Sequence, residues 1–102
     1  MPATISFILP VHNAADTIDD ALDAVVRADL GHPDIRREII VVDDASTDGT
    51  ADQLRRIAAR GLARVCFHAE TLGQGAALSS GLALVLSRLK AAWKPSPSNI
   101  RC

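Results

Sequence analysis

Hydrophobic residues are concentrated in three short runs, and segments with helical spacing separate these runs. The runs cover Ile5 to Leu9, Glu38 to Val42 and Arg64 to His68, and β-branched residues dominate the second. Continuous apolar runs of this length are typical of strands that are buried on both faces, as in a parallel sheet. Between the runs, apolar residues recur at the spacing of an amphipathic helix. The chain is therefore expected to alternate strands and helices.

Three helices are predicted, and each carries an apolar stripe that is expected to face the sheet. The stripes are formed by Ile18, Leu22, Val25 and Val26, then by Leu54, Ile57 and Ala58, and finally by Leu78, Leu82, Val85, Leu86 and Leu89. The second helix is expected to begin at Thr50. Strands that alternate with helices of this length imply parallel pairing through right-handed crossovers. The predicted fold class is α/β, with three parallel strands that form half of a doubly wound sheet.

The second apolar run ends at two carboxylates, Asp43 and Asp44, which a short polar turn follows. In open α/β sheets, ligands bind outside the carboxyl ends of the strands, so this acidic pair is placed for chemistry or binding. Adjacent strand residues point to opposite faces, so we expect one carboxylate to face a ligand and the other to brace the loop. Spacing leaves open which carboxylate takes which role. In the turn, Ser46 and Asp48 are expected to accept backbone hydrogen bonds and Gly49 to supply an unusual backbone angle.

Two further polar segments follow the other predicted strands. His12 comes just after the first run, where its ring could stack on a planar base, although a polar surface role is an equal alternative. Gly73-Gln74-Gly75 precedes the third predicted helix, and glycines at a helix N-terminus can bind phosphate. Leu78 stands where a dinucleotide fingerprint would have its third glycine. A loop that merely leads into a helix is therefore an equal alternative.

The composition excludes several classes of protein. The chain has 102 residues, enough for one small domain, and its 11 basic and 12 acidic residues nearly cancel. No global charge indicates a nucleic acid or a membrane surface as partner. No apolar stretch approaches the about 20 residues of a membrane span, and no secretion signal opens the chain, so a cytoplasmic location is expected. Residues 91–102 contain two prolines and no periodicity, which predicts a disordered tail.

Three segments together resemble the family 2 glycosyltransferases, inverting enzymes with the nucleotide-diphosphosugar (GT-A) fold. They are Ser6 to Asn13, Glu38 to Thr50 and Leu72 to Leu78. The resemblance implies that the chain is the N-terminal half of a Rossmann-like three-layer sandwich. It covers roughly residues 1–90, which we expect to form a partial nucleotide-sugar-binding domain, with residues 91–102 outside the family.

The resemblance also implies roles for individual residues around a UDP- or GDP-linked sugar. Pro10, Val11 and His12 would line the base pocket, and Asp44 would accept a hydrogen bond from the base. Gln74 and Gly75 would lie near the ribose and phosphates. Asp43 and Asp48 would mainly shape the loop. Position 14 is alanine, where many relatives have glutamate.

The chain also departs from the family pattern. The family continues with an Asp-x-Asp motif that binds Mn²⁺ or Mg²⁺ and the sugar diphosphate, followed by an acidic catalytic base. This chain has no acidic residue after Glu70, so we assign no metal ligand and no catalytic residue. A hexosyltransferase fragment that is inactive alone is therefore expected. Its sequence is expected to diverge from the family pattern near Leu89. The complete enzyme would act in the cytoplasm or at the cytoplasmic face of a membrane.

The departure from the family pattern has one consequence for solubility, and two other interpretations are alternatives to a glycosyltransferase. Without the Asp-x-Asp strand, the run Ile5 to Leu9 would form a bare apolar edge, which predicts self-association or poor solubility. One alternative is a receiver-like phosphoacceptor module, which also carries an acidic pair after an apolar strand, although its topology fits poorly. The other is a truncated gene product with no function of its own.

Overall fold

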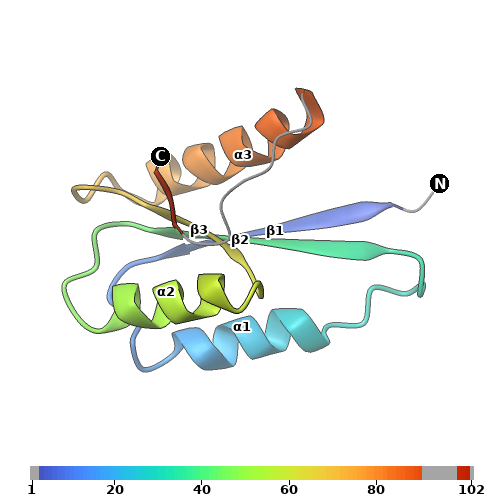
Figure 1. The fold of residues 1–102 in the computed structure, drawn as a ribbon, viewed down its shortest axis with the longest axis horizontal. Helices are drawn as coiled ribbons and strands as arrows, with labels where there is room; N and C mark the ends of the chain where they lie inside the picture. The colour runs from blue at the N-terminus through green and yellow to red at the C-terminus, as the bar shows by residue number, and fades with distance from the viewer. Residues whose placement is uncertain (1–2, 91–98, 102) are drawn as a thin grey trace.

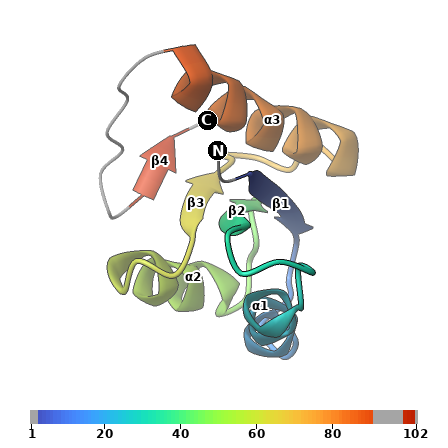
Figure 2. The same ribbon diagram turned by 90° about the vertical axis from the view of Figure 1, so that its right-hand side faces the viewer.

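The computed structural model describes residues 3–90 and 99–101, and they form a four-stranded parallel sheet with helices on both faces. The strand order is β1-β2-β3-β4, which equals the chain order. The strands are β1 (Thr4–Val11), β2 (Arg36–Asp43), β3 (Arg64–Phe67) and β4 (Asn99–Arg101). The helices are α1 (Ile18–Arg27), α2 (Thr50–Ala59) and α3 (Gln74–Lys90). Helices α1 and α2 cover one face and α3 covers the other, which gives three layers (Figure 1, Figure 2).

Strand β2 lies at the centre of the core. Its residues Ile40, Val41 and Val42 are fully buried. Val41 belongs to the apolar cluster under α1 and α2, whereas Ile40 and Val42 belong to the cluster under α3. This alternation confirms that the run is a strand buried on both faces. Each such side chain contributes roughly 1.5 to 3 kcal/mol by leaving water, which makes β2 the element that organises the sheet.

The carboxyl ends of three strands lie side by side. In the parallel register, Val11 of β1 is opposite Asp43 of β2, and Asp43 is opposite Phe67 of β3. The polar segments that follow these strands therefore start from the same edge of the sheet. This is the edge at which open α/β sheets bind ligands.

Helix α3 packs against the sheet with a face that differs from the predicted one. Ala77, Gly81 and Leu84 are buried, and Val85 packs beside them. The leucines of the predicted stripe are instead exposed, with 44%, 51% and 47% exposure at Leu78, Leu82 and Leu86. The side chain of Leu89 lies outside the described residues.

The close approach of α3 to β1 explains this difference. A Cβ atom on Gly81 would lie 2.4 Å from Cγ2 of Ile8, so a larger residue at this point would force the helix or the Ile8 side chain to move. The helix thus lies on the sheet through its small residues. On α1, Ile18 and Leu22 are buried and Val25 is partly buried as expected, but Val26 is 41% exposed.

The two edges of the sheet relate to the predictions of a bare edge at the first strand and of a disordered tail. Strand β1 pairs with β2, and on its other side no strand lies among residues 3–90 and 99–101. At the opposite edge, β4 pairs with β3 in parallel, with Cys66 opposite Ile100. Residues 99–101 were expected to be disordered, and that prediction is wrong for these three residues. The strand depends on the open edge of β3, a distant partner that local composition does not reveal. Residues 91–98 of the predicted tail lie outside the described residues.

Candidate functional site

A cavity opens at the carboxyl ends of β1 and β2. Its volume is about 220 Å³, and it is lined by Pro10, Val11, His12, Asp44, Gln74 and Ala77. Five of these residues were singled out from the sequence, and Ala77 was not. They come from three separate segments, which only the parallel pairing of the strands and the packing of α3 bring together.

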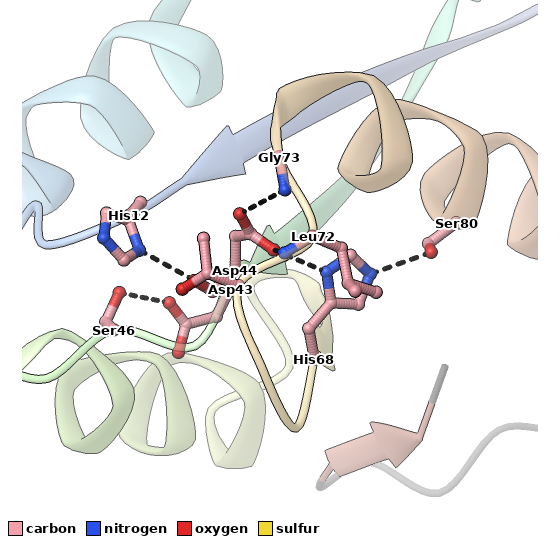
Figure 3. Close-up of polar contacts among 9 residues, drawn as sticks. His12, Asp43, Asp44, Ser46, His68, Leu72, Gly73 and Ser80 are labelled. Atoms are coloured by element: carbon pink, nitrogen blue, oxygen red, sulfur yellow. Dashed lines mark hydrogen bonds and ion pairs between the residues drawn. The ribbon is translucent and has the colours of Figure 1, made fainter.

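His12 forms an exposed wall of the cavity in a fixed orientation. Its Nδ1 lies 2.7 Å from the carbonyl oxygen of Asp44. A carbonyl oxygen can only accept, so Nδ1 carries the proton in this contact. The side-chain amide of Asn13 lies 3.4 Å from Nε2, which is then the acceptor. The imidazole is thus held at both nitrogens while its ring stays exposed, and Figure 3 shows its contact with Asp44.

Asp44 lines the cavity and also braces the loop before α3. Oδ1 accepts hydrogen bonds from the backbone N–H of Leu72 at 2.8 Å and from Nδ1 of His68 at 2.8 Å. Oδ2 accepts the N–H of Gly73 at 2.9 Å. The hydrogen bond from His68 and those from the two amides lower the pKa of Asp44 to about 2. The carboxylate therefore stays charged at all ordinary pH values.

Sequence reasoning missed His68, which is buried with 7% exposure. Its Nε2 lies 2.9 Å from Oγ of Ser80 in α3, so the imidazole bridges Asp44 and the helix (Figure 3). The signal that could have found it was its position, because His68 is the polar residue at the end of the third apolar run and His12 lies just after the first run. Ser80 carries no such signal, because its sequence position gives no indication of a partner twelve residues away.

Asp43 and Ser46 tie together the loops that follow β1 and β2. Asp43 is 2% exposed and accepts a hydrogen bond from the hydroxyl of Ser46. The Ser46 oxygen in turn accepts the backbone N–H of Asn13 at 2.9 Å. The side-chain oxygen of Asn13 accepts the N–H of Thr47 at 2.7 Å. These contacts link the two loops in both directions and leave Asp43 pointing away from the cavity, toward the loop.

Asp48 makes a second link between the same loops. Its carboxylate accepts the N–H of Thr50 at 2.9 Å and the N–H of Ala15 at 3.2 Å. The hydroxyl oxygen of Thr50 accepts the N–H of Ala14 at 2.9 Å. Hydrogen bonds from Thr50 lower the pKa of Asp48. The start of α2 is therefore joined to the segment that leads into α1.

Gly49 does not have the backbone role expected from the sequence. Its φ of −78° and ψ of 3° are accessible to any residue, and a Cβ at this position would meet open space. The left-handed angles are found instead at Ala45, with φ of 57°, and at Asn13, with φ of 52°. The tight turn comes directly after Asp44, where the chain leaves the strand, and this shifts the strained position four residues upstream.

Gln74 and Gly75 form the first turn of α3. Gln74 is exposed and lines the cavity, whereas Gly75 is exposed but not among the lining residues. Gly73, just before them, has φ of 95° and connects the loop to the helix. The N-terminus of α3 carries a partial positive charge, which suits an anionic group near this end of the cavity.

The family resemblance implied a divalent metal for the complete enzyme and no ligands for it in this chain. Across residues 3–90 and 99–101, no group of three His, Cys, Asp or Glu side chains is arranged to hold a metal ion. In the same part of the chain, no helix is both long and apolar enough to cross a membrane. What the cavity offers is an exposed aromatic ring, a charged acceptor and a helix N-terminus, a combination that suits a ligand with a planar ring and an anionic group.

Known proteins resemble the chain over most of its length. Residues 6–91 match the sequence model of glycosyl transferase family 2. A dodecaprenyl-phosphate galacturonate synthase of Rhizobium johnstonii is 34% identical over 83% of this chain and 25% of its own length. A poly(ribitol-phosphate) beta-glucosyltransferase of Bacillus spizizenii is 42% identical over 51% of this chain and 8% of its own length.

A solved structure shares both sequence and fold with the chain. The mannosyltransferase PcManGT from Pyrobaculum calidifontis, in complex with GDP-Man and Mn²⁺, aligns with a TM-score of 0.66 and 34% identity. The alignment covers 81% of this chain and 24% of that protein. The chain thus spans a quarter or less of the length of these relatives.

Proposed function

Because the chain belongs to glycosyl transferase family 2, we propose that it binds the nucleotide of a nucleotide-diphosphate sugar in the cavity beside Asp44. One observation carries the proposal: Pro10, Val11, His12, Asp44 and Gln74, taken from three segments, line a single cavity. The relative with GDP-Man bound supports a nucleotide sugar as the ligand class. The receiver-like alternative is set aside, since the chain's relatives are glycosyltransferases.

Each group around the cavity has a role in this proposal. The base stacks on the exposed ring of His12, which its two hydrogen bonds hold in place. A carboxylate offers roughly four acceptor positions, and Asp44 uses three of them within the protein, so one remains for a base N–H. The diphosphate lies toward Gln74 and Gly75 at the N-terminus of α3, where the helix dipole favours negative charge. Together these residues bind and orient the donor.

Sugar transfer itself requires more than these groups. We propose that transfer proceeds with inversion at an acceptor hydroxyl or phosphate and uses residues that lie in the remainder of the family fold. The chain spans a quarter or less of its relatives, and its described residues offer no metal-binding group. The chain alone is thus expected to bind the donor without turning it over. The cytoplasmic location expected from the sequence stays a prediction.

Calorimetric titration of the chain with UDP-glucose and with GDP-mannose, each with and without Mn²⁺, tests the proposal. We expect saturable binding of at least one of them. His12→Ala should weaken this binding roughly tenfold, because base stacking on a side-chain ring is lost, whereas His12→Phe should retain it. His32→Ala, in the loop after α1, is the matched control and should bind like the unmodified chain.

Two results would contradict the proposal. The first is the absence of binding with both nucleotide sugars, which would remove the function assigned to the cavity. The second is metal-dependent sugar transfer by the isolated chain, which would show that the catalytic parts are present after all.

A further inference from the structure

Asp44, His68 and Ser80 form a continuous chain of hydrogen bonds from the cavity to the second turn of α3. Nδ1 of His68 lies 2.8 Å from Oδ1 of Asp44, and Nε2 lies 2.9 Å from Oγ of Ser80. Asp44 and His68 are 5% and 7% exposed. Figure 3 shows the imidazole between the carboxylate and the helix. Such a buried polar chain is costly to break, because any member left without its partner loses water as well.

The chemistry of the partners fixes the direction of these hydrogen bonds. The Asp44 carboxylate only accepts, so Nδ1 of His68 is the donor. In the neutral imidazole, Nε2 then accepts the hydroxyl proton of Ser80. A serine within a helix commonly donates to a carbonyl of its own preceding turn. Here the Ser80 hydroxyl lies within hydrogen-bond distance of His68, so the contact connects α3 to the end of β3.

The same carboxylate holds the segment that leads into α3. Oδ1 accepts the N–H of Leu72, and Oδ2 accepts the N–H of Gly73. Gln74, the next residue, lines the cavity. A shift of the carboxylate would therefore move the loop and the first residue of the helix together. His68 contacts the same carboxylate, and Ser80 contacts His68 from α3.

We propose that His68 and Ser80 are positioning residues of the nucleotide cavity, which fix the Asp44 carboxylate and, through it, the Leu72–Gly73 segment. The inference rests on the proposed function and extends it to two residues that do not line the cavity. His68 holds Asp44 from the end of β3, and Ser80 holds His68 from α3. The cavity wall is thus set by three elements at once, before any ligand binds.

A nucleophilic role for Ser80 is the competing explanation, since serine, histidine and aspartate in this order are the residues of a hydrolase triad. Such a triad needs backbone N–H groups that point at the developing oxyanion. Ser80 lies inside α3, where the backbone N–H groups are used by the helix itself. Positioning is therefore the role that the geometry supports.

Ser80→Ala in the full chain tests the inference, with Ser80→Thr as the conservative variant and Ser79→Ala as the matched control. Ser79 is the exposed neighbour on the same helix. Native-state amide exchange measured by NMR reports on Leu72 and Gly73, with Val41 of β2 as the reference for global opening. Calorimetry with UDP-glucose and GDP-mannose reports on the cavity.

We expect Ser80→Ala to accelerate exchange at Leu72 and Gly73 roughly fivefold, the effect of losing one hydrogen bond, while exchange at Val41 changes less. Nucleotide affinity should fall by a similar factor. Ser80→Thr should retain the exchange rates and the nucleotide affinity of the unmodified chain, and Ser79→Ala should change neither. Unchanged exchange at Leu72 and Gly73, or equal acceleration at Val41, would overturn the inference. If the unmodified chain binds neither nucleotide, the proposed function fails, and the exchange data alone decide whether Ser80 positions the loop.

Discussion

At the scale of single residues, the acidic pair at the end of β2 shows how structure divides two adjacent carboxylates. The sequence predicted that one would face a ligand and the other would brace a loop. Asp43 hydrogen-bonds to Ser46 within the loop, while Asp44 lines the cavity and also holds the segment before α3. Asp44 thus combines a place in the cavity wall with bracing of the loop, because both of its oxygens accept backbone hydrogen bonds from that loop while the residue lines the cavity.

The hydrogen bonds to Asp44 predict a pH dependence of stability. Its folded pKa of about 2 lies below the ordinary value of 3.8. The charged carboxylate therefore stabilises the fold fully above about pH 4, and this contribution is lost as the pH falls toward 2. Asp44→Asn should lower the free energy of unfolding at neutral pH and reduce the loss of stability over this acidic range. Urea unfolding at a series of pH values measures both effects.

The exposed Asp20→Asn on α1 is the control for this experiment. It should leave the unfolding free energy and its pH dependence close to those of the unmodified chain. Since hydrogen bonds from Thr50 also lower the pKa of Asp48, some acid sensitivity should remain in Asp44→Asn. A variant Asp44→Asn with the full acid sensitivity of the unmodified chain would count against the role of these hydrogen bonds.

At the scale of elements, α3 shows that the most hydrophobic stripe of a helix need not be the buried one. The helix lies on β1 and β2 through Ala77, Gly81 and Leu84, whereas Leu78, Leu82 and Leu86 are exposed. Close packing of a helix on a sheet is favoured where small residues let the two backbones approach. At Gly81, the helix approaches the side chain of Ile8 in β1 closely.

Gly81→Ala is expected to destabilise the chain by about 1 to 3 kcal/mol, the usual cost of overpacking a filled core. The added Cβ would lie 2.4 Å from Ile8 Cγ2, a distance that forces the helix or the side chain to move. Gly75→Ala is the control, because a Cβ there meets open space. Chemical denaturation measures both. The double variant with Ile8→Ala should be less destabilised than the sum of its single changes, since the clash is then removed.

A second prediction separates the two faces of α3. Leu84→Ala should cost about 2 to 5 kcal/mol, since Leu84 belongs to the cluster under the helix. Leu82→Gln should change the free energy of unfolding by about 0.5 kcal/mol or less, because Leu82 is 51% exposed. Thermal and urea unfolding of the two variants would show the contrast. The reverse order would mean that the stripe predicted from the sequence is the buried face.

At the scale of the whole molecule, the feature with the widest consequence is the side of β1 on which residues 3–90 and 99–101 place no strand. An unpaired strand edge offers backbone donors and acceptors to another chain. Ile5 near its start is 39% exposed. Self-association through this edge stays a prediction, and the exposed leucines of α3, which packs on β1, would favour it.

Ile5→Lys is expected to reduce self-association, since a charged side chain at a strand edge opposes pairing with another strand. Sedimentation velocity over a range of concentrations measures the shift toward monomer. Leu62→Lys is the matched control, because Leu62 is 41% exposed and lies between α2 and β3, away from the β1 edge. Monomeric behaviour of the unmodified chain at all concentrations would contradict the prediction.

Much of the fold and part of the site could be predicted from the sequence. The α/β class, the three parallel strands and the family were predicted from the apolar runs and motifs and are confirmed. Five of the residues around the cavity were also named: His12, Asp44 and Gln74 lie in polar segments beside the predicted strands and helices, and Pro10 and Val11 came from the family resemblance. Their part in binding a nucleotide stays a prediction that the proposed titrations address.

The remaining features depend on contacts between distant segments. The approach of Gly81 to Ile8 decided which face of α3 is buried. The packing of α3 on the sheet brought Ser80 to His68 and so formed the bridge to Asp44. Strand β4 likewise needed the free edge of β3. The sequence by itself determined the strands, the helices and the edge at which the polar segments meet, because these features depend on local periodicity and on the residues at the strand ends. Only the tertiary structure decided which side chains meet, because packing distances and hydrogen bonds between elements leave no periodic pattern along the chain.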